Sequence, residues 1–430
     1  MKTPAKSPHN LRIAVVGSGI SGLASAYFLS RAHRVTLFES GAYFGGHTNT
    51  VDVTLNGVTH PVDTGFLVFN DRTYPNLIAL FQELGVQSHP SDMSFSVSRN
   101  KGEFEWAGTS LDTLFAQRSK LFSPSFAFMI RDILRFNRNA ESYLAQVEQS
   151  GCSLNELLIA GGYGKAFRDS YLLPMAGSIW SSKPSDILKF PAATFLRFCM
   201  NHALLQINDR PQWRTVIGGA RDYVRRILEK LPDIRAVCPV RSIQRHTDGV
   251  EIRTDAGTEH FDEVVLATHA PTSLRLLSNP TRQENEVLGA IKYQHNLAVL
   301  HTDASLLPVR RKVWSAWNYL TRDGQGHDQP ICVSYLLNQL QPIPFNDPVV
   351  VTLNPIQAPA ASQVIARFDY EHPVFDLGAI QAQTKVPVLQ GQNHTWYAGA
   401  WTGYGFHEDG LKSALRIARA FGLEPAWTRL

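Results

Sequence analysis

The sequence has few cysteines, and nothing in their spacing marks a site. Cys152, Cys199, Cys238 and Cys332 stand far apart and form no Cys-x-x-Cys pair. This spacing argues against a zinc site and a disulfide framework, and it favours a reducing compartment. The chain also has no Gly-x-Ser-x-Gly nucleophile elbow and no His-Glu-x-x-His motif, so we expect no metal site and no competing catalytic constellation.

Long apolar runs and long basic runs are absent as well. No apolar run approaches the ~18 residues that a membrane span requires, and residues 1–10 are polar, without the apolar core of a signal peptide. The net charge is only +4, and no five basic residues occur in succession, which argues against nucleic-acid binding. We therefore expect a cytoplasmic protein, and its 430 residues suggest two or three domains.

The stretch from Leu11 to His47 carries the pattern that organises the rest of the chain. An apolar β-type run, Leu11–Val16, leads into the turn Gly-Ser-Gly-Ile-Ser-Gly, and a small-residue helix of about three turns follows. A second apolar strand, Arg34–Phe38, ends on the acid Glu39. A strand, a glycine turn, a helix and a second strand in this order are typical of a dinucleotide site, whereas a glycine turn alone also serves structure.

Each residue type in this pattern has a physical reason. Gly17 permits the tight turn, Gly19 lets the backbone approach a pyrophosphate, and Gly22 lets the helix pack closely on the strand. The N-terminus of the helix offers unpaired N–H groups and a partial positive charge to the phosphates. Glu39 lies 22 positions after Gly17, where a carboxylate would accept hydrogen bonds from a ribose. The sequence therefore predicts a dinucleotide-binding domain.

A second glycine pair, Gly45-Gly46, follows Glu39 after five residues and has no role in a plain NAD site. Here the chain resembles the FAD-dependent amine oxidase and phytoene desaturase superfamily. The resemblance implies FAD as the cofactor, bound by a Rossmann-like domain of the glutathione-reductase type (GR2). That family usually has arginines at the places of Tyr43 and His47, so the usual phosphate and flavin contacts at these two positions stay open.

The resemblance places a strand end beside the flavin. Alternating apolar residues on either side of Asn56-Gly57 predict a type I′ hairpin over residues 51–62. The return strand delivers residues 63–66, Asp-Thr-Gly-Phe, which in the family lie beside the flavin. The alternative interpretation of Asp63 is a polar residue that closes a strand.

Two further strands carry positions that only the resemblance supplies. After the pair Gly218-Gly219 and its helix, a short strand is expected over Ala236–Val240, where the backbone of Val237 would meet the adenine. The run Asp262–Thr268 resembles the family's strand under the flavin nucleotide.

The C-terminal stretch resembles the end of the family's cofactor domain. Residues 396–399 end a strand, and residues 404–410 lead into a helix with Asp409 as its expected N-cap. In the family this helix points its N-terminus at the N1/C2 carbonyl edge of the flavin, where it stabilises the charge that reduction places there. The cofactor contacts that the motifs and the resemblance imply are Gly17, Gly19, Ile20, Ser21, Gly22, Glu39, Ser40, Gly45, Gly46, His47, Thr48, Asp63, Thr64, Gly65, Phe66, Val237, Val240, Thr268, Gly399, Glu408, Asp409, Gly410 and Leu411.

The fold class expected from these segments is α/β, with a discontinuous α+β substrate domain beside the FAD-binding domain. The expected boundaries are 1–70, 214–275 and 390–430 for the FAD-binding domain, and 71–213 and 276–389 for the substrate domain. The aromatic-rich segment 161–213 suits either an apolar cavity or a well-packed core.

A basic amphipathic segment lies between residues 115 and 139. In the expected helix 126–138, apolar residues gather on one side, while Arg131, Arg135 and Arg138 gather on the other. Such a helix can lie on an anionic membrane surface, for instance the inner face of the cell membrane. The alternative, which is common in soluble proteins, is a core helix with a solvated arginine face.

The resemblance implies a flavin oxidoreductase that takes a hydride from a carbon onto N5 of the flavin. Two departures argue against amine oxidation. Amine oxidases commonly carry a lysine near N5, on a strand aligned with residues 296–298, where this chain has Leu297. They also place an aromatic residue just before the final helix, where this chain has His407.

Longer segments, among them DTGFLVFNDRTYPNL, YLLPMAGSIWSS and GAWTGYGFHEDGL, resemble a bacterial family of predicted FAD-binding proteins often encoded beside cyclopropane fatty acid synthases. This resemblance covers nearly the whole chain. It implies a desaturase or oxidase acting on an unsaturated or methylated fatty acyl chain, with a functional link to a cyclopropane-type methyltransferase. A flavin-dependent amine oxidase, a non-redox flavin isomerase and a non-catalytic FAD- or acyl-binding partner of that methyltransferase are the alternatives.

His407 is the candidate catalytic acid/base, because its ordinary pKa is near 6.5 and it precedes the helix that would face the flavin. The alternative is a histidine that only hydrogen-bonds within its loop. His47 is expected to contact the flavin rather than to catalyse, and Glu408 is expected to cap or orient.

Overall fold

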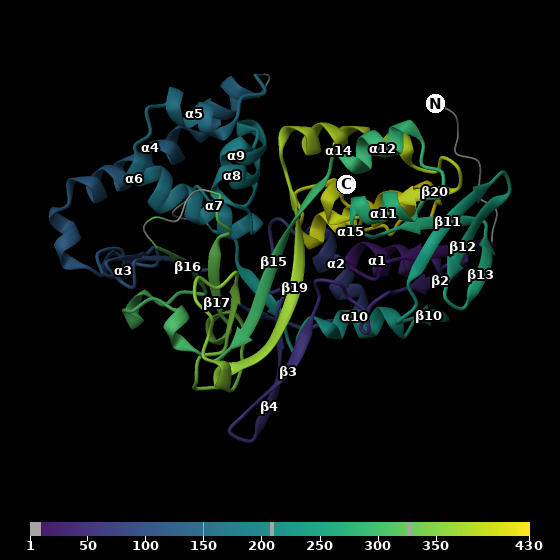
Figure 1. Cartoon of the computed structure of the whole chain (residues 1–430), viewed down its shortest axis with the longest axis horizontal. Helices are drawn as coiled ribbons and strands as arrows, with labels where there is room; N and C mark the ends of the chain where they lie inside the picture. Colours follow the sequence, from purple (N-terminus) through teal and green to yellow (C-terminus); the bar gives the residue numbers. More distant parts are fainter. Residues whose placement is uncertain (1–9, 149, 207–209, 323, 325–327) are drawn as a thin grey trace.

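A five-stranded parallel sheet in the order β10-β2-β1-β14-β20 forms the centre of one domain (Figure 1). The computed structural model describes residues 10–148, 150–206, 210–322, 324 and 328–430, so the polar stretch 1–9 lies outside the described residues. The strands are β1 (Arg12–Val16), β2 (Arg34–Phe38), β10 (Asp233–Arg235), β14 (Glu263–Leu266) and β20 (Thr395–Tyr397). They come from three separated parts of the chain, which confirms the expected α/β fold with a discontinuous domain.

Both faces of this sheet are covered. Successive residues of a strand point to opposite sides of the sheet, and each side packs into its own apolar core. Ile13 and Val15 of β1 contribute to one apolar core, and Ala14 and Val16 contribute to another. The first core is shared with helices α1 (Ile20–Leu29), α2 (Pro75–Leu84), α10 (Arg221–Leu228) and α15 (His407–Ala420). The second is shared with the antiparallel strands β11 (Val240–His246), β12 (Gly249–Thr254) and β13 (Gly257–Phe261) and with helices α11 (Ala270–Leu276), α12 (Arg282–Gly289) and α14 (Leu377–Leu389).

Helices α2, α12 and α14 extend this domain beyond the boundaries expected from the sequence, which ended its first segment at residue 70 and excluded 276–389. Leu77 of α2 shares a core with α1 and α15, and Ala382 of α14 shares one with β14 and β20. Apolar periodicity predicts that a helix buries one face, but it does not identify the surface that covers that face.

A buried ion pair ties α12 to the strands of this domain. The side chains of Glu284 and Arg245 are only 2% and 7% exposed, and they contact each other through two hydrogen bonds. Glu284 also accepts a hydrogen bond of 2.7 Å from the Tyr397 hydroxyl at the end of β20. One carboxylate therefore joins a helix, the antiparallel sheet and the parallel sheet.

The second domain is built on a seven-stranded sheet in the order β19-β15-β18-β17-β16-β7-β8. Its strands are β7 (Phe95–Arg99), β8 (Phe104–Ala107), β15 (Lys292–His301), β16 (Trp317–Thr321), β17 (Cys332–Leu336), β18 (Val350–Leu353) and β19 (Val364–Val374). All neighbours pair antiparallel except β16 and β7. The long pair β15–β19 runs from this sheet towards α14 (Figure 1). Smaller pairings involve β3 (Thr50–Leu55), β4 (Val58–Asp63), β5 (Phe69–Asn70), β6 (Ser88–Pro90) and β9 (Trp213–Val216).

A group of helices in the second domain has a separate apolar core and occupies the upper left of Figure 1. They are α4 (Pro124–Val147), α5 (Leu154–Ala160), α6 (Lys165–Phe167), α7 (Leu173–Trp180), α8 (Pro184–Lys189) and α9 (Ala192–Asn201), with η2 (Arg168–Leu172) among them. The short elements α3 (Leu111–Leu114) and η1 (Arg118–Phe122) precede α4 and contribute no buried residue to this core. Short helical turns elsewhere are η3 (Ala304–Leu306), η4 (Arg311–Val313), α13 (Leu337–Leu340), η5 (Ala361–Gln363) and η6 (Ala400–Thr402). Within the described residues, no helix combines the length and the apolar character needed to cross a bilayer.

The local turn chemistry is confirmed at one position and corrected at another. Asn56 and Gly57 both have positive φ, 50° and 79°, as the hairpin between β3 and β4 requires. The strand expected over Ala236–Val240 is wrong, because β10 ends at Arg235 and β11 begins at Val240. Val237 lies in the connection with φ of 50°, a left-handed conformation that interrupts any strand.

Candidate active site

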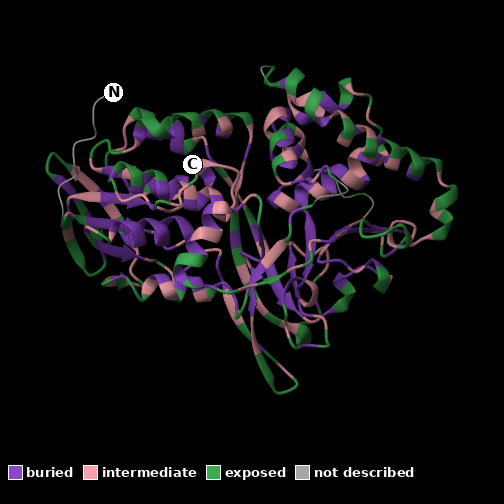
Figure 2. Ribbon diagram, turned by 180° about the vertical axis from the view of Figure 1, so that it is seen from behind, coloured by how far each residue is buried: buried purple, intermediate pink, exposed green. Residues whose placement is uncertain are grey.

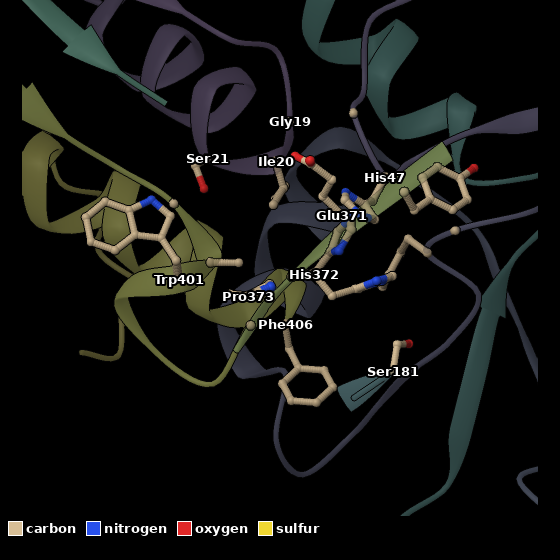
Figure 3. A pocket seen from close by; sticks show the side chains of 18 of the residues that line it. Gly19, Ile20, Ser21, His47, Ser181, Glu371, His372, Pro373, Trp401 and Phe406 are labelled. Atoms are coloured by element: carbon tan, nitrogen blue, oxygen red, sulfur yellow. The ribbon is translucent and has the colours of Figure 1, made fainter. Parts of the chain in front are cut away.

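A cavity of about 530 Å³ lies where the two domains meet. Its wall includes residues at the carboxyl ends of β1, β2, β14 and β20, together with residues 370–373 of β19 (Figure 3). Those four strands are parallel, so their carboxyl ends share one edge of the sheet. Ligands of open α/β sheets bind at this edge, and the cavity has the position that the sequence pattern predicts.

The glycine turn after β1 has the geometry that its residues suggest. A Cβ atom at Gly22 would lie 1.8 Å from the Gly17 carbonyl oxygen and 3.2 Å from Ala267 Cβ, so only glycine allows α1 to approach the turn. At Gly19, by contrast, no atom lies within 4 Å of the position that a Cβ would occupy, and Gly19 lines the cavity. The backbone at the N-terminus of α1 is therefore open to the cavity.

Ser18 connects three segments around Glu39, the acid expected to bind a ribose. Its hydroxyl donates to Glu39 Oε2 over 2.5 Å, and the same hydroxyl accepts from the N–H of Gly45 over 3.1 Å. The N–H groups of Ser18 and Gly41 donate to the two oxygens of the Glu39 carboxylate. Sequence reasoning missed Ser18, although a small hydroxyl residue between the two glycines of the turn was the available signal.

The second glycine loop packs directly on the first. A Cβ atom at Gly46 would lie 3.1 Å from the Cα of Gly19, so the two loops meet backbone to backbone. His47 follows, and its buried Nε2 has no hydrogen-bond partner within the described residues. Burial, with a smaller contribution from His269, lowers the pKa of His47 from 6.5 to about 4, so the imidazole is neutral at neutral pH.

Histidines from three segments line one side of the cavity, and Figure 3 shows two of them, His47 and His372. The His47 ring stacks on Tyr370 and meets His372 edge-on, with 5.1 Å between ring centroids in both cases. Burial lowers the pKa of His372 to about 3, with contributions from His47 and His269. His269 lies 3.0 Å from a carboxylate oxygen of Glu371. This side of the cavity therefore presents several imidazole rings, and their burial favours the neutral form of each ring.

Sequence reasoning did not single out the β19 residues of this wall. The segment lies within residues 276–389, which the sequence predicts to be part of the substrate domain without indicating a site there. Tyr370 and His372 are two positions apart, so on a strand they share a face. The spacing of two positions between Tyr370 and His372 could therefore have indicated that both side chains face the same site.

His407, the candidate acid/base, is the first residue of α15. Its ring stacks on Phe66 at 3.6 Å between centroids, and its Nε2 lies 3.0 Å from the Thr48 hydroxyl and 3.3 Å from the Tyr223 hydroxyl. Burial, with a smaller effect of His47, lowers the pKa of His407 to about 3. One ring nitrogen is therefore occupied within the protein, and the neutral form is favoured. A catalytic role for His407 stays a prediction.

The start of α15 corrects two expectations. Phe406 is the N-cap residue, and the Asp409 side chain accepts from the Phe406 N–H over 3.0 Å, as the third residue of the helix rather than its N-cap. Because the helix already begins at His407, the residue just before it is the aromatic Phe406, which lines the cavity. The expected lack of an aromatic residue just before the final helix therefore no longer argues against amine oxidation.

The second domain contributes a mostly apolar part of the wall. Its apolar lining residues are Met93, Ile179, Phe198, Leu204, Trp213, Trp317, Tyr335 and Leu353. Among the described residues that line the cavity there is no Asp, Lys or Arg, and the only carboxylates are those of Glu39 and Glu371.

The structure brings most of the predicted cofactor residues to the cavity. Those that line it are Gly17, Gly19, Ile20, Ser21, Glu39, Ser40, Gly45, Gly46, His47, Thr64, Gly65, Phe66, Thr268 and Gly399. The catalytic candidate His407 lines it as well. Those that do not line it are Gly22, Thr48, Asp63, Val237, Val240, Glu408, Asp409, Gly410 and Leu411.

Asp63 connects elements behind the cavity. Its carboxylate accepts hydrogen bonds from the Thr50 hydroxyl, the Ala220 N–H and the Gln341 amide. Burial raises the pKa of Asp63 to about 7 against the opposing effect of these donors. Asp63 thus fastens the β3–β4 hairpin to the start of α10, which agrees with its interpretation as a residue that closes a strand.

Glu408 also acts within the protein. Its two oxygens accept from the N–H groups of Asn76 and Leu77 over 3.1 and 3.0 Å, and therefore cap the N-terminus of α2. Gly410 packs against α1, because a Cβ there would lie 2.7 Å from Ile20 Cγ2. Leu411 is fully buried in the core between α1 and α15. These residues position α15 rather than line the cavity.

The adenine-side positions lie outside the cavity. Val237 is 70% exposed, and its N–H donates to the Gly41 carbonyl over 3.0 Å. Val240 begins β11 and is buried in the core between the two sheets. A contact of the adenine with the Val237 backbone stays a prediction.

The wall fits FAD. Gly19 is open towards the cavity at the positive N-terminus of α1, where a diphosphate would be stabilised. Glu39 directly follows β2, at the position of the acid that would bind the ribose. The buried ring nitrogens His47 Nε2 and Trp401 Nε1 line the cavity region and have no partner within the described residues. Buried polar atoms are normally hydrogen-bonded, so a ligand with polar atoms along this wall would satisfy them.

Comparison with known proteins gives a family match and several structural matches. The family model of flavin-containing amine oxidoreductases matches residues 20–351. A search of curated protein sequences found no significant match.

Three solved structures illustrate the similarity in fold. A CLA-producing fatty acid isomerase from P. acnes is 16% identical with a TM-score of 0.67, over 97% of this chain and 99% of that chain. A triple mutant of putrescine oxidase is 17% identical with a TM-score of 0.68, over 95% and 98%. Cyclohexylamine oxidase from Brevibacterium oxydans IH-35A is 15% identical with a TM-score of 0.67, over 96% and 100%. At these identities the matches establish the fold, and they do not select a substrate.

Proposed function

This chain belongs to the flavin-containing amine oxidoreductases and is an FAD-dependent oxidoreductase, and within that family we propose that its substrate is a fatty acyl chain. In the proposed reaction a hydride leaves a carbon of an unsaturated or methylated acyl chain, as in a desaturase or oxidase. When bound, the flavin supplies the hydride acceptor. The residues of this chain bind and orient both partners and exclude water.

The observation that carries this proposal is the apolar part of the wall. Ile179, Trp317 and Leu353 line it with other apolar side chains, and no Asp, Lys or Arg lies among the described lining residues. Burying an ammonium group without a carboxylate partner is costly. Glu371 already contacts His269, and Glu39 is bonded to Ser18 and Gly41. An uncharged hydrocarbon needs no carboxylate partner, and its burial against these side chains lowers the free energy of the complex.

The histidine wall suits the same substrate. Burial lowers the pKa of His47, His372 and His407 to about 4, about 3 and about 3. These rings are then neutral at physiological pH and bring no ionic charge to the hydrocarbon. The N-terminus of α15 lies beside them through Phe406 and His407, and its partial positive charge would stabilise negative charge on a reduced ring system.

The similarity in fold to a fatty acid isomerase supports the same class of substrate. A protein of this fold is described as an isomerase of fatty acids, so the architecture can accommodate an acyl chain. Putrescine oxidase and cyclohexylamine oxidase share the fold to the same extent, and the wall chemistry of this chain is what favours the acyl substrate. A functional link to a cyclopropane-type methyltransferase stays a prediction.

Anaerobic bleaching of the bound flavin tests the proposal. FAD-loaded protein is mixed with unsaturated phospholipid in detergent micelles, and in parallel with putrescine and with cyclohexylamine. We expect the visible flavin absorbance to fall with the lipid and to persist with the amines. Bleaching by an amine and not by the lipid would overturn the proposal. A lipid whose double bond moves without oxidant and without bleaching would retain the acyl chain and reject hydride removal.

A charge placed in the apolar wall provides the matched variant. Ile179→Glu adds a carboxylate among apolar lining residues, and we expect it to retain FAD while slowing lipid-dependent bleaching by at least about tenfold, since one unpaired buried charge costs more than 1.4 kcal/mol. Ile159→Glu is the control, because Ile159 is 70% exposed on α5 and does not line the cavity.

A further inference from the structure

Exposed apolar side chains gather at the end of the molecule farthest from the parallel sheet. They belong to α3, η1, the start of α4 and the segment before η4, which we call the apolar tip: Leu111, Leu121, Phe122, Phe128 and Val309, exposed by 75%, 52%, 88%, 54% and 65%. In Figure 1 the blue segment that contains α3 and the start of α4 forms the left end of the chain. Figure 2 shows many exposed residues at the same end from behind.

Contacts within this end hold its segments together. Gln117 donates to the carbonyl oxygen of Gly102 over 3.1 Å, and a Cβ at Gly102 would lie 3.0 Å from Val309. Asp112 of α3 contacts Arg118 of η1 at 2.7 Å and Lys312 of η4 at 3.3 Å. The apolar tip is therefore one surface, although its residues come from distant parts of the chain.

The charge around the apolar tip has one predominant sign. Arg118 and Arg131 have side chains 68% and 61% exposed, and Lys120, Arg311 and Lys312 add three further positive charges. The exposed acids in these segments are Asp112 and Glu103, whereas Asp132 is buried. An aromatic and aliphatic surface ringed by basic side chains is complementary to an anionic lipid bilayer.

Two of the three arginines on the face expected from the sequence also make contacts within the protein. Arg131 and Arg135 both contact the buried carboxylate of Asp132, at 3.0 and 3.5 Å. Arg135 also lies over the Tyr163 ring at 4.1 Å and donates to the Gly162 carbonyl. A membrane contact through the arginine face of 126–138 stays a prediction, and the turns that precede this helix provide a second candidate, which has exposed apolar side chains as well as charge.

We propose that the apolar tip docks on the surface of a bilayer that contains anionic phospholipid. Phe122 and Leu121 insert among the headgroups, and the surrounding lysines and arginines pair with lipid phosphates. The proposal concerns a surface outside the cavity, and it supplements the proposed function by placing the enzyme where acyl chains are found. Binding needs no turnover, so its test is independent of the substrate.

Vesicle flotation measures the docking directly. Holoenzyme is mixed with vesicles of equal parts phosphatidylglycerol and phosphatidylcholine, or of phosphatidylcholine alone. We expect flotation with the first and not with the second, and we expect added salt to reduce it. Phe122→Asp should lower partitioning at least about tenfold, because it replaces an inserted aromatic ring by a charge. Ile159→Asp, at an exposed apolar position outside the tip, is the control and should float like the wild type.

A second pair of variants tests the charge. Each basic side chain near an anionic bilayer contributes roughly a fivefold gain in partitioning, so Lys120→Glu with Arg311→Glu should lower it by about thirtyfold or more. Lys230→Glu with Arg282→Glu changes the net charge equally at sites away from the tip and should have a much smaller effect.

Three results would overturn the proposal. The wild type fails to float with the anionic vesicles, or the control pairs lose as much flotation as the tip variants. Alternatively, the wild type is a dimer in solution that Phe122→Asp converts to a monomer without changing flotation, which would assign the tip to a second copy of this chain.

Discussion

Replacing Gly19 by valine separates cofactor binding from folding. Gly19 has φ of −62° and ψ of 176°, an extended conformation that valine adopts readily, and no atom lies within 4 Å of its Cβ position. The folded apoprotein should therefore be as stable as the wild type, or more stable by about 0.4–1 kcal/mol through the restricted unfolded chain. The new side chain projects into the open space beside the N-terminus of α1, where a diphosphate would lie.

The expected loss of affinity follows from that obstruction. If the phosphates lose only two charge-assisted hydrogen bonds, at about 1.5–3 kcal/mol each, FAD affinity falls about a hundredfold or more. The assay is the ratio of visible to ultraviolet absorbance after gel filtration in excess FAD, together with thermal unfolding of the apoprotein. Gly19→Val protein that unfolds like the wild type and retains full FAD would refute this placement of the diphosphate.

Gly22→Ala is the complementary variant. Its Cβ would meet the Gly17 carbonyl oxygen at 1.8 Å, so α1 must shift by more than 1 Å, and overpacking of this kind costs about 1–3 kcal/mol. We expect Gly22→Ala to lower the melting temperature of the apoprotein, whereas Gly19→Val does not. Equal melting temperatures for the two variants would contradict the assigned geometry of the turn.

Three further outcomes are expected. Glu284→Ala should lower the free energy of unfolding by about 3–5 kcal/mol because it leaves a buried arginine unpaired, whereas exposed Glu286→Ala on the same helix should change it by less than about 0.5 kcal/mol in urea titrations. Burial lowers the pKa of His372 to about 3, so the unfolded chain binds the extra proton between pH 6.5 and 3 and stability falls with falling pH there; His372→Gln should flatten this slope and exposed His246→Gln should not. Because burial lowers the pKa of His407 to about 3, His407→Gln should leave the pH profile of flavin bleaching above pH 5 unchanged, and a shift of that profile would instead identify His407 as the acid/base.

Local patterns predicted the local geometry well. The strand, the glycine turn and α1 depend on contacts within about thirty residues, and the structure has them where the residue types require. The type I′ turn at Asn56-Gly57 is likewise decided by the left-handed preferences of those two residues. Patterns of this kind depend on the conformational preferences of residues that are close together in the sequence, so the residue types are enough to predict them.

Long-range contacts account for what the sequence could not predict. Asp63 resembles a flavin contact in its motif, but its partners Thr50, Ala220 and Gln341 lie on three other segments. Glu408 likewise bonds to α2, more than three hundred residues earlier in the chain. His372 joins the cavity only through the position of β19. A side chain's role then depends on which distant surface reaches it, and residue type and spacing do not determine that surface.

The position of β20 and α15 has a consequence for folding. β20 pairs with β14 at one edge of the parallel sheet, and α15 packs along α1, although the whole second half of the substrate domain separates β14 from β20 in the sequence. Contacts between such distant segments form slowly, because the entropy of closing the intervening chain is lost before the contacts stabilise the fold. The part of the cavity wall at Gly399 and His407 should therefore be completed late in folding, and FAD binding should follow that step.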